Sequence, residues 1–133
     1  MSDLPASPYP GIRPFREAEE YLFFGRETQV DAMVDTLARG RFLAVIGSSG
    51  CGKSSLVNCG LRPALHRGLL TRAGSAWRIA SCRPGGHPLR ALAQALAAPG
   101  ALYRKLDDGP FTLAEFIETT LAMSRRGLVE TWQ

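Results

Sequence analysis

A glycine-rich run in the first half of the chain has the residue types and the spacing that bind the phosphates of a nucleotide. Residues 47–54 read Gly-Ser-Ser-Gly-Cys-Gly-Lys-Ser and fit the pattern G-x-x-x-x-G-K-[ST] at every constrained position. Of the chain's 16 basic residues only Lys53 and Lys105 are lysines, so composition does not explain a lysine at the position that the motif requires. The run therefore predicts a phosphate-binding loop for a nucleoside triphosphate with Mg²⁺.

Each residue type in this loop has a physical role. Glycines can adopt positive φ and bring bare backbone close to a ligand. Backbone N–H groups and the dipole of a helix that starts near Lys53 are expected to converge on the phosphates. Lys53 would supply a mobile charge to the β- and γ-phosphates, and the Ser54 hydroxyl would ligate Mg²⁺. With Ser55 as an additional phosphate contact, the candidate residues are Gly47, Ser48, Ser49, Gly50, Cys51, Gly52, Lys53, Ser54 and Ser55.

A loop of this kind must connect a strand to a helix. Residues 41–46 are apolar and partly β-branched, which predicts a buried strand. The helix after the loop is expected to end at about Leu61, because Pro63 biases Arg62 away from helical angles. The alternative is a glycine-rich turn between the two elements that binds nothing.

The remaining elements follow from prolines, apolar periodicity and capping patterns. Residues 1–15 hold four prolines and should run extended. Residues 76–81 alternate like a second strand, and Thr112 with Glu115 forms a capping box for a helix. Helical apolar stripes are predicted at Val30, Met33, Val34 and Leu37, ended by Gly40 as C-cap, at Leu89, Leu92, Ala93 and Leu96, and at Leu113, Phe116, Ile117 and Leu121.

Composition restricts the class of protein. The 133 residues, 45% hydrophobic and 21% charged, suit one small folded domain. No apolar run is long enough to span a bilayer and no signal peptide is visible, so a cytoplasmic location is expected. The net charge of +4 comes from scattered arginines, so nucleic acid is not an expected partner. The three cysteines indicate neither a disulfide framework nor zinc, although Cys51 lies in the loop as a candidate for modification.

Four motifs together resemble a known family. They are residues 8–15 (PYPGIRPF), residues 23–27 (FFGRE), the loop with Ser-Leu-Val at 55–57, and residues 60–65 (GLRPAL). From about Pro8 onward the chain resembles the start of the novel STAND NTPases, first subgroup, where STAND denotes signal-transduction ATPases with numerous domains. Trp77 and the residues near Arg83-Pro84-Gly85 and Pro88-Leu89 are similar to the family's next segment.

The resemblance implies a fold, a ligand and partners. The fold would be α/β, a P-loop NTPase αβα sandwich with a parallel sheet. Members are ATP-driven switches in large bacterial proteins, with sensor repeats toward the C-terminus, so ATP, Mg²⁺ and further domains are the implied cofactors and partners. Gly25 and Arg26 would lie beside the adenine and help to close its pocket. The alternative for this segment is a plain helix N-terminus, where Glu27 complements the helix dipole.

The chain departs from the family in one respect. Hydrolysis needs an apolar strand that ends in Asp, with Glu close behind, and no such segment is found. Asp107-Asp108 does not follow a buried strand and is interpreted as a turn. We expect residues 1–15 to be an extended Pro-rich lead-in, because of their four prolines. Residues 16–133 would be the incomplete N-terminal portion of the NTPase domain, without the acidic strand and all that follows it, and marginally stable by itself.

Two other functions remain open. A transporter-type or other P-loop ATPase also suits the Gly-Cys-Gly-Lys-Ser run, although no upstream base-stacking aromatic or downstream signature loop is found. A non-catalytic, nucleotide-responsive interaction or regulatory module would suit the missing acids. A GTPase is disfavoured because no Asn-Lys-x-Asp sequence occurs.

Overall fold

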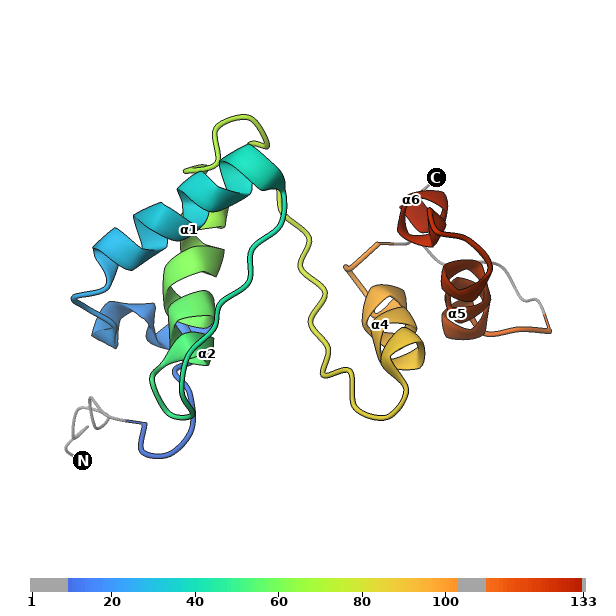
Figure 1. The fold of residues 1–133 in the computed structure, drawn as a ribbon, viewed down its shortest axis with the longest axis horizontal. Coiled ribbons are helices and arrows are strands. Elements are labelled where there is room, and N and C mark those ends of the chain that lie inside the picture. The colour runs from blue at the N-terminus through green and yellow to red at the C-terminus, as the bar shows by residue number, and fades with distance from the viewer. Residues whose placement is uncertain (1–9, 103–109, 133) are drawn as a thin grey trace, which may run out of the picture. The chain divides into compact units, whose positions relative to one another are not determined.

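The computed structural model describes residues 10–102 and 110–132. They belong to two compact units, one ending at Trp77 and the other beginning at Arg78 (Figure 1). The first unit contains the phosphate-loop motif, residues 10–15 of the lead-in and residues 23–27. Asp107-Asp108, interpreted as a turn, falls outside the described residues.

The first unit is built from two long helical stretches and a short one. The short one, η1 (Glu17–Leu22), is a 3₁₀ helix, and α1 (Glu27–Gly40) follows it. After the loop come α2 (Lys53–Ser55), the π-helical η2 (Leu56–Leu61) and α3 (Arg62–His66). These three segments join without a break, because the residues at their junctions all have right-handed helical angles. We call residues 53–66 the loop helix.

The core of the first unit lies between α1 and the loop helix. Met33 and Val34 are buried on α1 and pack against Leu61, Ala64 and Leu65. The partly buried Val30 and Leu37 extend the same face of α1, so the predicted stripe is confirmed. This packing holds the second half of the loop helix against α1.

The end of α1 differs from the prediction by one residue. Gly40 is the last helical residue, and the C-cap is Arg41, which has φ 55° and donates its N–H to the Leu37 carbonyl. Arg41 is the only non-glycine with positive φ that is found in the described residues. A left-handed conformation costs an L-residue about 1–2 kcal/mol, so the chain bears strain where it leaves α1.

The loop helix does not end near Leu61, so the prediction from Pro63 was wrong. Arg62 keeps helical angles (φ −59°, ψ −49°), and its N–H bonds to the carbonyl of Val57, five residues earlier. Proline removes one backbone donor and clashes with the carbonyl four residues before it. The wider π turn accommodates both effects, and the helix continues to His66.

The expected α/β fold with a parallel sheet is not found. In residues 10–102 and 110–132 the regular elements are all helical, without a strand or a sheet. Of the predicted strand 41–46, Leu43 and Val45 pack against the core, whereas Phe42 and Ile46 are 76% and 91% exposed. The alternation that a strand needs is therefore present, but a strand also needs a neighbour to bond its N–H and C=O groups. The segment 76–81, predicted as a second strand, forms no strand either.

The second unit contains three helices, α4 (Pro88–Ala97), α5 (Leu113–Met123) and α6 (Gly127–Trp132). Its core is Ala93, Leu96 and Ile117, which lie on the predicted stripes of α4 and α5. The predicted capping box is confirmed, because Thr112 Oγ1 accepts the N–H of Glu115 and the Glu115 carboxylate accepts the N–H of Thr112.

A helix that spans a membrane must be both long and apolar. Within residues 10–102 and 110–132, no helix has both the length and the apolar character that crossing a bilayer requires.

Candidate functional site

The glycine-rich loop turns at two of its glycines. Gly50 (φ 78°) and Gly52 (φ 89°) are both left-handed, and each has open space where a side chain would start. Gly52 is the N-cap of the loop helix and makes no side-chain capping bond. The first N–H groups of the loop helix, from Lys53 onward, therefore lack the partner that a capping side chain would supply.

Lys53 lies across the inside of the loop. Its Nζ donates to the carbonyl oxygens of Gly47 at 2.8 Å and Ser48 at 2.5 Å, and lies 3.7 Å from the sulfur of Cys51. The same sulfur packs over Gly47, where an added Cβ would lie 2.8 Å from it. The ammonium and the thiol thus close the loop on itself and hold the lysine charge beside the start of the loop helix.

A cavity of about 450 Å³ opens beside the loop. Gly50, Gly52, Lys53, Ser54 and Ser55 line one part of it. The rest of the lining comes from the lead-in and from one aromatic residue after η1, namely Pro10, Gly11, Ile12, Arg13, Pro14, Phe15 and Phe23. The volume lies within the range of small-ligand sites, and the lining combines a few polar groups with apolar surface, as such sites do.

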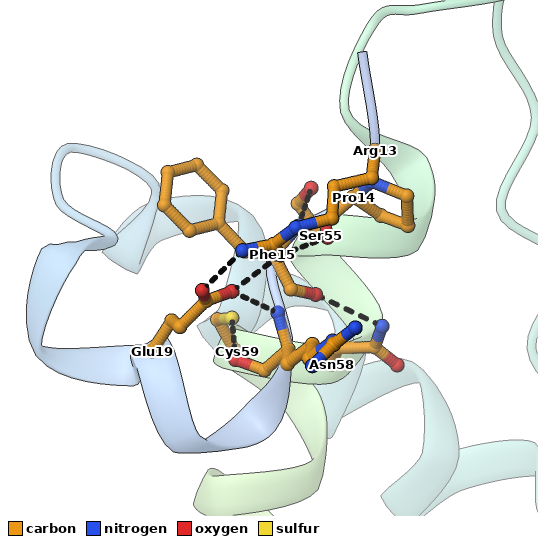
Figure 2. Close-up of polar contacts among 8 residues, drawn as sticks. Arg13, Pro14, Phe15, Glu19, Ser55, Asn58 and Cys59 are labelled. Carbon is orange, nitrogen blue, oxygen red and sulfur yellow. Dashed lines mark hydrogen bonds and ion pairs between the residues drawn. The ribbon is translucent and has the colours of Figure 1, made fainter. Parts of the chain in front are cut away.

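The lead-in is hydrogen-bonded to the loop helix (Figure 2). The N–H of Phe15 donates to Ser55 Oγ at 3.0 Å, and Asn58 Nδ2 donates to the carbonyl of Phe15 at 3.1 Å. The thiol of Cys59 donates to the carbonyl of Arg16 at 3.0 Å. We call these three contacts the lead-in latch. Burial raises the pKa of the Cys59 thiol, so this sulfur stays a neutral donor.

An ion pair supports the lead-in from its other side. The two outer nitrogens of Arg13 bond to the two carboxylate oxygens of Glu19 at 2.8 and 2.5 Å, and Glu19 also accepts the N–H of Arg16 at 2.8 Å. The Arg13 guanidinium, followed by the Arg16 N–H, lowers the pKa of Glu19 to about 2. Arg13 therefore reaches the cavity with a carboxylate already bound to it.

The acidic face of η1 is paired with α3. Glu17 lies 3.7 Å from Arg62 and 3.9 Å from His66, and Glu20 pairs with Arg67 just after the helix. The lead-in and η1 therefore contact the loop helix along most of its length. The latch lies near its start and the ion pairs lie near its end.

Gly25 and Arg26 do not line the cavity beside the loop. Arg26 lines a second cavity, of about 690 Å³, together with Tyr21, Phe24, and Glu17 and Glu20 of η1. Gly25 (φ 79°) donates its N–H to the Glu27 carboxylate at 3.1 Å, and backbone N–H bonds from Glu27 itself and from Gly25 lower the pKa of Glu27. Glu27 thus acts at the start of α1 as the helix-terminus interpretation expects. Phe23 lines both cavities.

Several residues at the site were not predicted as site residues. Phe15 and Phe23 meet edge to face, with ring centroids 5.9 Å apart and planes at 65°, and both line the cavity beside the loop. They belong to the motifs at 8–15 and 23–27, so those motifs were the available signal. Asn58 had no such signal, because its partner Phe15 lies 43 residues away in the sequence.

The comparisons with known proteins agree with the motifs. Neither the curated proteins nor the solved structures include a significant match. A family model, described as Novel STAND NTPase 1, matches residues 8–130 and so covers residues 8–15 of the lead-in, the loop and most of the second unit. Because that match spans nearly the whole sequence, the chain belongs to the novel STAND NTPase 1 family.

Proposed function

We propose that this chain binds Mg-ATP in the cavity beside the loop, as the nucleotide-binding part of a STAND signal-transduction module. The observation that carries the proposal is the set of uncapped N–H groups at the start of the loop helix, next to the Lys53 ammonium and the Ser54 hydroxyl. These groups surround a cavity that also offers apolar and aromatic surface. Phosphates are bound by N–H groups, an ammonium and a hydroxyl, and a nucleotide base is bound by apolar and aromatic surface.

The loop residues would divide the phosphate contacts among them. The backbone from Gly47 to Gly52 would wrap the phosphates, and Lys53 would exchange its carbonyl partners for charged phosphate oxygens, which form stronger hydrogen bonds. The Ser55 oxygen already accepts the Phe15 N–H, and its own proton stays available for a phosphate oxygen. The full set is Gly47, Ser48, Ser49, Gly50, Cys51, Gly52, Lys53, Ser54 and Ser55.

Gly25 and Arg26 would act at the edge of the adenine. They lie two and three residues after Phe23, whose side chain lines the cavity beside the loop as well as the second cavity. We propose that the left-handed turn at Gly25 sets the position of Phe23 against the base. Arg26 would then contribute from the second cavity.

The metal would be held chiefly by Ser54 and the phosphates. Mg²⁺ takes oxygen ligands and keeps several waters, so one hydroxyl from the protein suffices when phosphates supply the rest. Among the residues that the structure describes, no group of three or more His, Cys, Asp or Glu could hold a metal. When bound, Mg²⁺ would neutralise phosphate charge. The chain's own groups would orient the phosphates.

In a STAND module, nucleotide exchange or hydrolysis would bias a conformational equilibrium that further domains, such as sensor repeats, respond to. The family supports this proposal. The lead-in, which is bonded to the loop helix through Phe15, is one segment whose position would depend on the nucleotide.

The proposal is tested by titrating Mg-ATP into the chain and into Lys53→Ala by calorimetry. Hydrogen bonds of a charged donor contribute about 1.5–3 kcal/mol, so we expect Lys53→Ala to bind at least about tenfold more weakly. Arg39→Ala is the matched control, because Arg39 is an exposed cation on α1 that lines no part of this cavity. Equal affinities of Lys53→Ala and the unchanged chain would refute the role of Lys53.

A further inference from the structure

We infer that the lead-in latch positions residues 10–15 as one wall of the nucleotide cavity, and that Asn58 is a positioning residue for nucleotide binding. The inference rests on the proposed function and adds to it a residue that touches no phosphate, base or metal. Asn58 would raise the affinity for Mg-ATP by holding the lead-in in position, without changing the phosphate contacts.

The first step is that side chains of the loop helix hold the lead-in in place. Residues 10–16 contain turns and irregular backbone but no helix or strand. The main chain of Phe15 is bonded on both sides, by Ser55 at its N–H and by Asn58 at its carbonyl, and both contacts are partly buried (Figure 2). Asn58 thus supplies the donor that the Phe15 carbonyl needs away from water.

The second step is that the latch and the phosphate groups lie on one rigid element. Ser55 and Asn58 both bond to the main chain of Phe15, so they share a face of the loop helix. Lys53 and Ser54 begin the same helix and line the cavity. A change at Asn58 can therefore release the lead-in wall while the loop with Lys53 remains as it is.

The third step is that Asn58 itself stays outside the cavity. Pro10 to Phe15 line it and so do Lys53 to Ser55, but Asn58 does not. Its side chain is half-buried and bonds to the Phe15 carbonyl. We therefore expect Asn58 to affect nucleotide affinity through the lead-in. By linkage, a nucleotide that contacts both walls must also stabilise the docked lead-in by the same factor.

The experiment measures Mg-ATP affinity and backbone hydrogen exchange in Asn58→Ala and Asn58→Asp. The aspartate keeps the shape of asparagine but places a carboxylate oxygen against the Phe15 carbonyl. We expect the Kd for Mg-ATP to rise about fivefold in Asn58→Ala, the effect of losing one ordinary hydrogen bond, and further in Asn58→Asp. Asn58→Gln, which retains the amide donor, should bind more tightly than Asn58→Ala.

Hydrogen exchange gives the readout that a merely structural role would not move. In the unchanged chain, Mg-ATP should slow exchange in peptides that contain Phe15. In Asn58→Asp these peptides should exchange faster, and Mg-ATP should protect them less. Val34→Ala is the control, because Val34 is buried in the core and does not line the cavity. It should lose stability but keep both the Kd and the protection of the lead-in.

The outcomes separate the inference from the function beneath it. If the unchanged chain binds Mg-ATP, Lys53→Ala binds weakly and the Asn58 variants bind normally, the inference is overturned and the proposed function stands. If Val34→Ala weakens binding as much as Asn58→Ala, the effect is general destabilisation and the inference is overturned as well. If the unchanged chain does not bind Mg-ATP, both are overturned.

Discussion

Val30 of α1 lies directly against Gly60 of the loop helix. A Cβ built on Gly60 would lie 2.5 Å from Cγ2 of Val30, which is closer than real carbon atoms come. Gly60 is buried and directly follows Cys59, whose thiol bonds to the carbonyl of Arg16. A residue without a side chain at this point lets the loop helix contact α1 on one side and the lead-in on another.

Gly60→Ala should therefore destabilise the first unit. Alanine favours a helix by up to about 1 kcal/mol over glycine, but the overlap with a β-branched side chain that has one preferred rotamer should outweigh this gain. Overpacking of this kind costs about 1–3 kcal/mol. We expect a net loss of about 1 kcal/mol, measured as the midpoint shift in urea unfolding.

Val30→Ala provides the partner for a double-mutant cycle. It removes the Cγ2 atom that the new methyl group meets, so the double variant should be more stable than the sum of the two single losses allows. Strictly additive losses would show that the two residues do not meet in the folded chain.

Gly47→Ala should weaken nucleotide binding through Cys51. The new Cβ would lie 2.8 Å from the Cys51 sulfur, so the loop must open or the thiol must move. An overlap of this size costs about 1–3 kcal/mol, which corresponds to about fivefold or more in the Kd for Mg-ATP. Calorimetric titration of the variant measures this change.

The matched rescue is Gly47→Ala combined with Cys51→Ala. Removing the sulfur should restore most of the affinity, because the Cβ then finds only the more distant Lys53 carbons at 3.8–3.9 Å. If the double variant binds as weakly as Gly47→Ala, the loop needs glycine at this position for a reason other than the thiol.

Arg41→Gly should stabilise the end of α1. Arg41 holds φ 55°, a conformation that costs an L-residue about 1–2 kcal/mol and glycine almost nothing. The unfolded chain gains freedom with glycine, so the expected net gain is about 0.5 kcal/mol in thermal or urea unfolding.

Gly40→Ala, at the neighbouring position, is a second variant that should stabilise the end of α1 for a different reason. Gly40 is helical and has open space at the Cβ position, so alanine should add up to about 1 kcal/mol from helix propensity. A loss of stability in Arg41→Gly alone would mean that Arg41 side-chain contacts matter more than its backbone strain.

The Arg13–Glu19 pair predicts a pH dependence on the acid side. The pKa of Glu19 is lowered from an ordinary 4.5 to about 2, so the folded state holds this proton less tightly than the unfolded state does. The stabilisation is then fully present above pH 4.5 and is lost as the pH falls toward 2. The stability difference between the unchanged chain and Glu19→Gln should shrink over that range.

The titration of Glu19 can also be followed directly by carbon-detected NMR of its carboxyl group. A midpoint near 2 is expected, and Arg13→Ala should move it upward because the strongest of its hydrogen bonds is gone. A Glu19 midpoint near 4.5 in the unchanged chain would contradict the pairing.

Local signals predicted the helices well. The residues that define the Val30–Leu37 stripe lie close together in the sequence, and so do those of the Thr112–Glu115 capping box. Each pattern can therefore be recognised from a short segment alone. The same holds for the family motifs, whose match now covers residues 8–130. Features that depend only on residues close together in the sequence could be predicted from the sequence.

Features that depend on distant partners could not. The apolar run at 41–46 alternates as a strand does, yet the described residues give it no neighbour to form a sheet. The bond from Asn58 to Phe15 spans 43 residues, and nothing near either residue announces it. Pro63 misled for a related reason, since local preference predicts an end to the helix but core packing of Ala64 and Leu65 favours its continuation.

The π turn between Leu56 and Leu61 also determines how far the two ends of the loop helix are rotated relative to each other about the helix axis. Each residue of an α-helix advances about 100° around the axis, so an extra residue in one turn rotates everything beyond it by that angle. Asn58 is thereby matched to Phe15 while Arg62 is matched to Glu17. Deleting one residue from this turn would keep the chain helical and turn one of the two faces away from its partner.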